Sequence, residues 1–186
     1  MNALQVQLMD FQYPSSEELK KLAQLDSTFS KKTRHVRTSN NTFHSNCTPM
    51  SQSTWAFTSI EKNLPSVKQA CDFIAGNIGK RVQCNAYFTP QGAQGLPIHY
   101  DLHDVIVLQI EGSKDWKIWP AFRSKVSIET LLLDEKENLP VWTSSIHPKE
   151  LHLSNKQSLY LSRGEPHVAI ATSEDSLHLS FGVYHD

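Results

Sequence analysis

The chain has 186 residues and a formal net charge of −1, a length that suits one domain with a sizeable buried core. The near-zero charge excludes a bulk electrostatic attraction to nucleic acid or to a membrane surface, so we expect no stable binding of either. The basic stretch at residues 31–37 is the exception, and we interpret it as a solvated loop rather than a phosphate contact.

Cysteine usage and the N-terminus bear on location. The three cysteines, Cys47, Cys71 and Cys84, form no CxxC spacing, and their odd number is typical of a reducing compartment rather than of a disulfide framework. The N-terminus lacks the charged segment and apolar run of a signal peptide. No stretch approaches the roughly 18 apolar residues of a membrane span. We therefore expect a cytoplasmic protein.

The first half of the chain mixes helices with little strand pattern. Alternation over residues 4–11 predicts a short strand. Residues 14–25 predict a helix, with a serine cap and early acids. Residues 26–53 are polar with little periodicity and predict a loop. Residues 55–60 predict a strand or buried edge, and helical spacing over residues 65–78 predicts a second helix.

From Val82 onward the pattern changes to short strands and turns, with a less ordered excursion over residues 121–140. Residues 105–110 and 115–119 predict a hairpin with a polar tip. The remaining predicted strands are 82–89, 141–142, 152–153, 158–162, 167–172 and 177–184. Several short strands at close spacing indicate a sandwich or barrel, for which a jelly roll is the natural choice.

The change of pattern near Val82 is not accompanied by a linker. We therefore expect one domain over residues 1–186. Residues 1–81 would form a small, partly helical N-terminal cover, and residues 82–186 a catalytic β-helix core.

The tripeptide His99-Tyr100-Asp101 lies between the glycine-rich stretch 92–97 and an apolar strand. In an extended segment, residues i and i+2 point to the same face, so the His99 imidazole and the Asp101 carboxylate can bind one metal ion. A third ligand is available in His167, which follows a Gly/Pro turn. Two histidines and one carboxylate form the facial triad of non-haem Fe(II) oxygenases.

A competing pair, His103-Asp104, follows immediately. In an extended strand His103 shares a face with His99 and Asp101, so the spacing leaves His103 open as a ligand. We expect it instead to orient Asp101 or to face the substrate.

Two further residues have possible roles beside a metal. Lys114, thirteen residues after Asp101, is either an exposed turn lysine or a buried cation that pairs with a dicarboxylate cosubstrate. Tyr87, twelve residues before His99, is either a core aromatic residue or a hydroxyl donor to the same carboxylate.

Residues 85–101, 103–118, 159–167 and 176–180, spread over roughly the last hundred residues, closely resemble the JmjC-type cupin family of ribosomal oxygenases. The resemblance implies a mainly β, double-stranded β-helix fold that binds Fe(II) and 2-oxoglutarate and uses O₂ to hydroxylate an unactivated C–H bond. By position, the residues that match metal ligands are His99, Asp101 and His167. Those that match cosubstrate residues are Lys114 and Tyr87, and Asn85 and His178 fall on motif positions near the pocket.

The sequence departs from that family at several places. Lys156-Gln157 stand where the family has Gly-Asp, and Ser162 replaces a common proline. The sequence ends at Asp186, whereas the ribosomal oxygenases continue into a dimerisation region and a winged-helix region. Ribosomal-protein substrates and the usual dimer are therefore left open.

We expect hydroxylation of a side chain in a protein or peptide. The alternatives within the same chemistry are hydroxylation of a free amino acid or natural-product intermediate, and N-demethylation. A non-catalytic metal-binding cupin and a zinc hydrolase are alternatives of other classes. Lys114 with Tyr87 argues against the hydrolase, which needs no dicarboxylate clamp.

Overall fold

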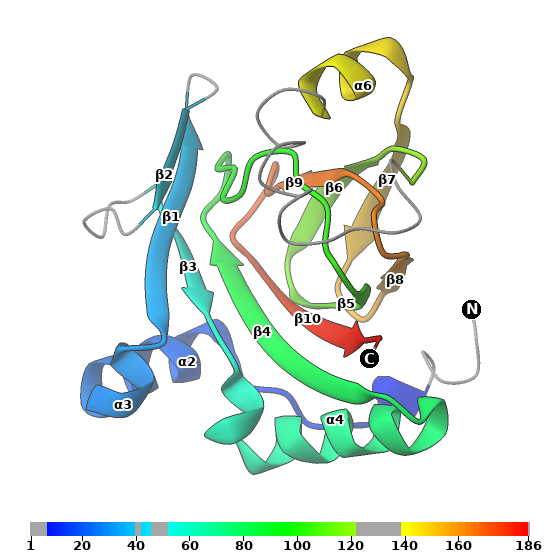
Figure 1. Cartoon of the computed structure of the whole chain (residues 1–186). Helices are drawn as coiled ribbons and strands as arrows, with labels where there is room; N and C mark the ends of the chain where they lie inside the picture. The colour runs from blue at the N-terminus through cyan, green and yellow to red at the C-terminus, as the bar shows by residue number, and fades with distance from the viewer. Residues whose placement is uncertain (1–6, 40–41, 46–51, 122–138, 186) are drawn as a thin grey trace.

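The computed structural model describes residues 7–39, 42–45, 52–121 and 139–185. Its core is a pair of antiparallel sheets (Figure 1). The larger has the order β2-β1-β3-β4-β10-β5-β8, and the smaller β7-β6-β9. The strands are β1 (Thr33–Ser39), β2 (Thr42–Ser45), β3 (Thr54–Phe57), β4 (Arg81–Thr89), β5 (Asp104–Glu111), β6 (Ser113–Ile118), β7 (Lys149–Ser154), β8 (Ser158–Leu161), β9 (His167–Ile170) and β10 (Ser176–Tyr184). The helices are α2 (Ser16–Leu25), α3 (Ser27–Ser30), α4 (Pro65–Ile78) and α6 (Leu139–Ser145), with a 3-10 turn, η1 (Ile60–Lys62).

The smaller sheet is extended at its β9 edge by two isolated antiparallel bridges. Gln94 pairs with Ile170, and His99 pairs with His167. The segment before Asp101 therefore acts as a fourth strand, opposite the four strands β4-β10-β5-β8 of the larger sheet. The predicted mainly β jelly roll, a double-stranded β-helix, is confirmed.

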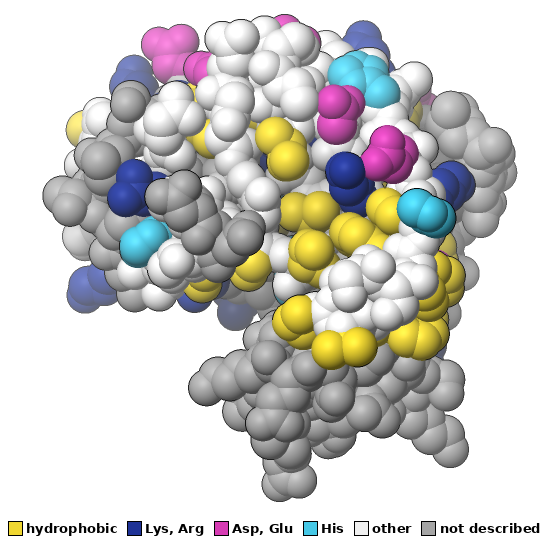
Figure 2. All heavy atoms as spheres, turned by 90° about the horizontal axis from the view of Figure 1, so that it is seen from above, with side chains coloured by type: hydrophobic (Ala, Val, Ile, Leu, Met, Phe, Trp, Pro, Cys, Tyr) yellow, Lys and Arg dark blue, Asp and Glu magenta, His cyan; other side chains and the backbone are white. Residues whose placement is uncertain are grey.

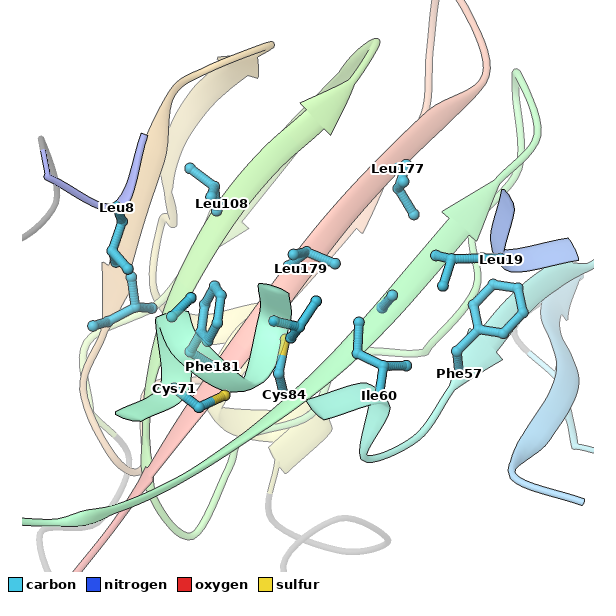
Figure 3. Packing of buried hydrophobic residues seen from close by; sticks show 14 of the residues in the cluster. Leu8, Leu19, Phe57, Ile60, Cys71, Cys84, Leu108, Leu177, Leu179 and Phe181 are labelled. Carbon is cyan, nitrogen blue, oxygen red and sulfur yellow. The ribbon is translucent and has the colours of Figure 1, made fainter. Parts of the chain in front are cut away.

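Alternation along β4 and β10 divides the larger sheet into two faces. One face carries apolar residues that pack under α4 and the N-terminal segment, where Ile60, Cys84, Leu179 and Phe181 point into one core (Figure 3). The opposite face carries polar residues and looks toward the smaller sheet. Every second side chain of these strands therefore lines a cavity between the two sheets.

The two predicted N-terminal helices are confirmed. Helix α2 begins with a capping box, in which Ser15 and Glu18 each bond the other's backbone N–H. Helix α4 begins at Pro65 and ends at Ile78, and the residue that caps it, Gly79, has a φ of 71°, which suits a residue without Cβ. Ile78, in the last turn of α4, is 39% exposed.

Two other N-terminal predictions are wrong. The predicted loop 26–53 contains α3, β1 and β2. These strands lie at the edge of the sheet and are mostly half-buried or exposed, so they lack the apolar alternation that marks a strand. The predicted strand 4–11 is helical at residues 7–8, and its first three residues lie outside the described part of the chain. Its apolar Leu8 is buried in the core without strand pairing.

The predicted hairpin between β5 and β6 is also wrong. Strand β5 pairs with β10 and β8, whereas β6 pairs with β7 and β9, so the two strands belong to different sheets. The chain changes sheet at Gly112, which has a φ of 60°. This corner directs Lys114 into the space between the sheets rather than to a solvent-exposed tip.

At the end of the molecule seen in Figure 2, hydrophobic side chains gather around the position of α6. This short helix replaces the predicted strand 141–142, and Val141 on it is 64% exposed. Of the predicted excursion 121–140, residues 122–138 lie outside the described part of the chain. Within the described residues, no helix has the length and apolar character to cross a bilayer.

Candidate functional site

The structure brings His99, Asp101 and His167 together at the edge of the smaller sheet. Each offers one ligand atom, and the three atoms lie within 4.8 Å of one another. Nε2 of His167 is 3.7 Å from Oδ2 of Asp101. Within the described ranges this is the one group of three His, Cys, Asp or Glu side chains spaced to hold a metal ion.

Both imidazole rings are oriented by backbone carbonyls two residues earlier in the chain. Nδ1 of His99 lies 2.8 Å from the carbonyl oxygen of Pro97, and Nδ1 of His167 lies 2.9 Å from that of Glu165. A neutral imidazole that donates from Nδ1 keeps the lone pair of Nε2 for a metal. Burial, reinforced by the neighbouring His99, lowers the pKa of His167 to about 4, so this ring is neutral at physiological pH.

The backbone fixes the relative position of the two metal-binding segments. His99 and His167 exchange both backbone hydrogen bonds, N–H to carbonyl oxygen, at 3.2 and 2.8 Å. The N–H of Gly164 also donates to the carbonyl of Asp101 at 3.0 Å. A tight turn with Gly164 at a φ of 81° thus holds the His167 strand against the tripeptide.

Lys114 is buried, at 3% exposure, inside the cavity between the sheets. Its Nζ donates to Oγ1 of Thr89 at 2.8 Å and lies 3.0 Å from Nδ1 of His178. Burial lowers the pKa of Lys114 to about 7, and burial followed by the Lys114 charge lowers the pKa of His178 well below its usual value. Neutral His178 therefore accepts the hydrogen bond from Lys114.

Tyr87 and Trp116 connect the lysine to the metal-binding residues. The Tyr87 ring stacks on His178 at 5.1 Å between centroids. The Trp116 ring lies 5.5 Å from His178 and 6.1 Å from His167. Burial, and then the Asp101 charge, raises the pKa of Tyr87 to about 12, so its hydroxyl keeps its proton and can donate a hydrogen bond.

Asn85 also lines the cavity, two residues before Tyr87 on β4 and on the same face of the sheet. Its Oδ1 accepts the N–H of Ser59 at 3.0 Å. The Asn85 side chain also forms a hydrogen bond with the Tyr87 hydroxyl, so Asn85 orients Tyr87 in the cavity. The structure thus places all seven predicted site residues around one cavity of about 100 Å³, several times the space that one water molecule needs.

His103 lies outside the metal-binding group, because the chain bends after Asp101 rather than continuing as an extended strand. Its ring stacks on Tyr184 at 4.5 Å between centroids. Asp104 faces away and accepts hydrogen bonds from the N–H of Arg163 and from Nε2 of His185. The alternative pair therefore does not contribute to the triad.

A family model described as the JmjC domain matches residues 57–186. The chain belongs to the JmjC domain family. This JmjC chain is 32% identical over 127 residues to a Dictyostelium discoideum protein named bifunctional lysine-specific demethylase and histidyl-hydroxylase NO66, covering 64% of the chain and 23% of that protein. It is 33% identical over 111 residues to mouse ribosomal oxygenase 2, covering 57% of the chain and 22% of that protein. The chain thus spans less than a quarter of the length of these two relatives.

Solved structures of the Escherichia coli ribosomal oxygenase YcfD share the fold of the JmjC chain. One superposes with a TM-score of 0.72 at 17% identity, covering 95% of this chain and 47% of that one. Another holds cobalt and 2-oxoglutarate, and it superposes with a TM-score of 0.66 at 17% identity, covering 95% and 46%. At this identity the likeness establishes the fold alone.

Several cavity residues of the JmjC chain were missed from the sequence. Thr89 and Gln83 have the same strand parity as Asn85 and Tyr87, and Trp116 is two residues after Lys114. The period of two along β4 and β6 is the signal that finds them. The same period along β10, counted from His178, finds Gly182 and Tyr184 at the other end of the cavity.

Proposed function

We propose that this chain carries an Fe(II)- and 2-oxoglutarate-dependent oxygenase centre that hydroxylates an unactivated C–H bond, on a side chain of a protein or peptide. One observation carries the proposal. The His99, Asp101, His167 group and the buried ammonium of Lys114 open onto the same cavity, with Trp116 in contact with both His167 and His178.

The donor set of the triad fits Fe(II). Two imidazole nitrogens and one carboxylate suit a borderline divalent metal, and three protein ligands leave coordination positions for a cosubstrate. The protein contributes orientation, because carbonyl groups fix the rings of both His99 and His167.

The other end of the cavity fits a dicarboxylate. A buried ammonium attracts a carboxylate strongly, because the low dielectric does not screen the charge. Thr89 and His178 hold Nζ of Lys114 in place, and the Tyr87 hydroxyl, hydrogen-bonded to the Asn85 side chain, supplies a hydrogen-bond donor nearby. When bound, iron and 2-oxoglutarate supply the O₂-dependent oxidation. A zinc hydrolase has no use for this buried cation.

The names of the relatives support a protein substrate, since they refer to lysine demethylation, histidyl hydroxylation and ribosomal oxygenation. Because the chain spans only part of those proteins, we propose a protein or peptide as the class of substrate and leave the particular side chain unassigned. We further propose that residues 57–186 act as one domain with the N-terminal strands, since β3 pairs directly with β4. The free thiols of Cys71 and Cys84 support a reducing, cytoplasmic location.

The test is formation of succinate from 2-oxoglutarate by purified protein with Fe(II), ascorbate and O₂. We expect succinate from the wild type and a loss of at least about 100-fold in His99→Ala, since two ligands hold the metal poorly. The matched control is His152→Ala, an exposed histidine paired with Asp115 on the outer side of β7, which should retain wild-type turnover.

Metal binding by the wild type without succinate formation and without 2-oxoglutarate binding would contradict the proposal and favour a non-catalytic cupin. Hydroxylation of free amino acids, with none of peptides, would replace the protein substrate by a small molecule.

A further inference from the structure

The cavity extends beyond the metal-binding residues, away from Lys114. Alternate residues of β10 face it, from His178 through Ser180 to Gly182. Gly182 is four residues beyond His178, which corresponds to about 13 Å at the usual strand rise. The proposed 2-oxoglutarate site at Lys114 therefore occupies one part of the cavity, and the part near Gly182 is left for a second ligand.

The triad lies between these two ends. His167 faces the Lys114 end, where Trp116 contacts both His167 and His178. Asp101 also lines the cavity, and its charge acts to raise the pKa of Tyr87 toward one end and of His103 and Tyr184 toward the other. A group that entered from the Gly182 end would thus approach the metal site from the side opposite Lys114.

His103 occupies this second end. A Cβ atom built on Gly182 would lie 2.6 Å from Nε2 and 2.7 Å from Cδ2 of His103. The imidazole therefore fills the volume that any other residue at position 182 would need. Glycine at this position is what lets the ring lie against β10.

The Tyr184 ring, on which His103 stacks, is itself held in place. The Arg81 guanidinium lies 3.8 Å from the centroid of the Tyr184 ring. The Tyr184 hydroxyl donates to Oε1 of Gln83 at 3.3 Å. The ring of His103 thus lies against two fixed surfaces, Gly182 and Tyr184.

The side chain of His103 packs through its ring rather than through hydrogen bonds. Across the described ranges, no hydrogen bond joins its nitrogens to another residue, and the side chain lines the cavity. The ring stacks on Tyr184 through its face and has its Nε2–Cδ2 edge against Gly182, so its bulk closes this end of the cavity.

We propose that His103 is a specificity-determining residue, which closes the end of the cavity opposite Lys114 and limits the size of the side chain that reaches the triad. This inference rests on the proposed function, because it assigns the second part of the cavity to the substrate. A smaller residue at position 103 should enlarge the substrate part of the cavity. A side chain at position 182 should displace the His103 imidazole into the same part and make it smaller.

The experiment compares the wild type with His103→Ala, Gly182→Ser and the surface control His152→Ala. Each protein is incubated with Fe(II), ascorbate, 2-oxoglutarate and the tryptic peptides of a whole-cell extract. Mass spectrometry identifies residues that gain one oxygen atom, and succinate is measured in the same samples. Circular dichroism checks folding, and each cavity variant tests the inference by itself if the other fails to fold.

We expect His103→Ala to modify side chains larger than those modified by the wild type, with a preference changed by about tenfold or more. Gly182→Ser should shift the preference toward smaller side chains, and His152→Ala should match the wild type. The inference is overturned if both cavity variants modify the same residues at the same relative rates as the wild type, or if succinate forms and no protein modifies a peptide. Absence of succinate in every sample would instead contradict the proposed function, and the inference would fall with it.

Discussion

Among the described residues that line the cavity, Lys114 carries the one ammonium group, and burial lowers its pKa to about 7. The unliganded protein therefore holds this lysine partly deprotonated at neutral pH. A dicarboxylate needs the protonated form, whereas its own carboxylates stay ionised across the neutral and alkaline range.

The affinity for 2-oxoglutarate should therefore fall as the pH rises above about 7. The folded pKa is depressed, so the charged state is lost through that pH rather than near the ordinary value for lysine. We expect the dissociation constant to rise by up to about tenfold per pH unit between pH 7 and 9. Calorimetric titration of metal-loaded protein at several pH values measures it.

The matched variants for this prediction are Lys114→Ala and Lys117→Ala, on the same strand. Lys117 points out of the sheet and pairs with Glu150, with half of its side chain exposed. Removing Lys114 should weaken 2-oxoglutarate binding by roughly 10- to 100-fold and remove its pH dependence. An unchanged dissociation constant in Lys114→Ala would mean that another residue binds the distal carboxylate.

At the scale of elements, the corner between β5 and β6 decides which way Lys114 points. Gly112 has a φ of 60°, and a Cβ atom there would overlap the carbonyl oxygen of Asp175. Any side chain at this position meets both an unfavourable backbone conformation and a fixed backbone atom. The change of sheet at this point therefore depends on glycine.

We expect Gly112→Ala to lower the free energy of unfolding by about 2 kcal/mol or more. The control is Gly76→Ala, on the exposed side of α4, where a Cβ atom meets nothing within 4 Å. That change should raise the free energy of unfolding by about 0.5–1 kcal/mol. Urea denaturation followed by circular dichroism measures both, and equal effects of the two substitutions would refute the role assigned to the corner.

At the scale of the whole molecule, the metal-binding residues join segments that are far apart in sequence. His99 and Asp101 precede β5, and His167 begins β9, so a bound ion links parts of the fold that separate on unfolding. A ligand that binds the folded state alone stabilises it by mass action, by about 2.7 kcal/mol at 100 times its dissociation constant.

Saturating Co(II), used as an oxygen-stable substitute for Fe(II), together with 2-oxoglutarate should raise the unfolding temperature of the wild type by several degrees. The same addition should raise that of His152→Ala equally and leave that of His167→Ala nearly unchanged. Differential scanning calorimetry in buffer with and without both ligands makes the comparison. An equal rise in His167→Ala would show that the metal binds elsewhere.

The sequence by itself determined the features that depend on local pattern and on strand parity. The capping box before α2, the helical spacing of α4 and the period of two along β4 and β10 act over a few residues, so they can be read directly. The same reasoning put His99 and Asp101 on one face. The same reasoning failed to predict the strands within residues 26–53. The edge strands β1 and β2 bury little apolar surface, so their sequences show no alternation of apolar and polar residues.

Only the tertiary structure decided how distant segments meet. The corner at Gly112 sends β5 and β6 into different sheets, which decided between the two interpretations of Lys114, an exposed turn lysine and a buried cation, in favour of the buried cation. The bend after Asp101 separates His103 from the triad and places it against Gly182. Both outcomes depend on long-range packing. Gly112 lies so close to the carbonyl of Asp175 that a Cβ atom would overlap it, and Gly182 leaves the space that the His103 ring occupies. No local pattern in the sequence records these contacts.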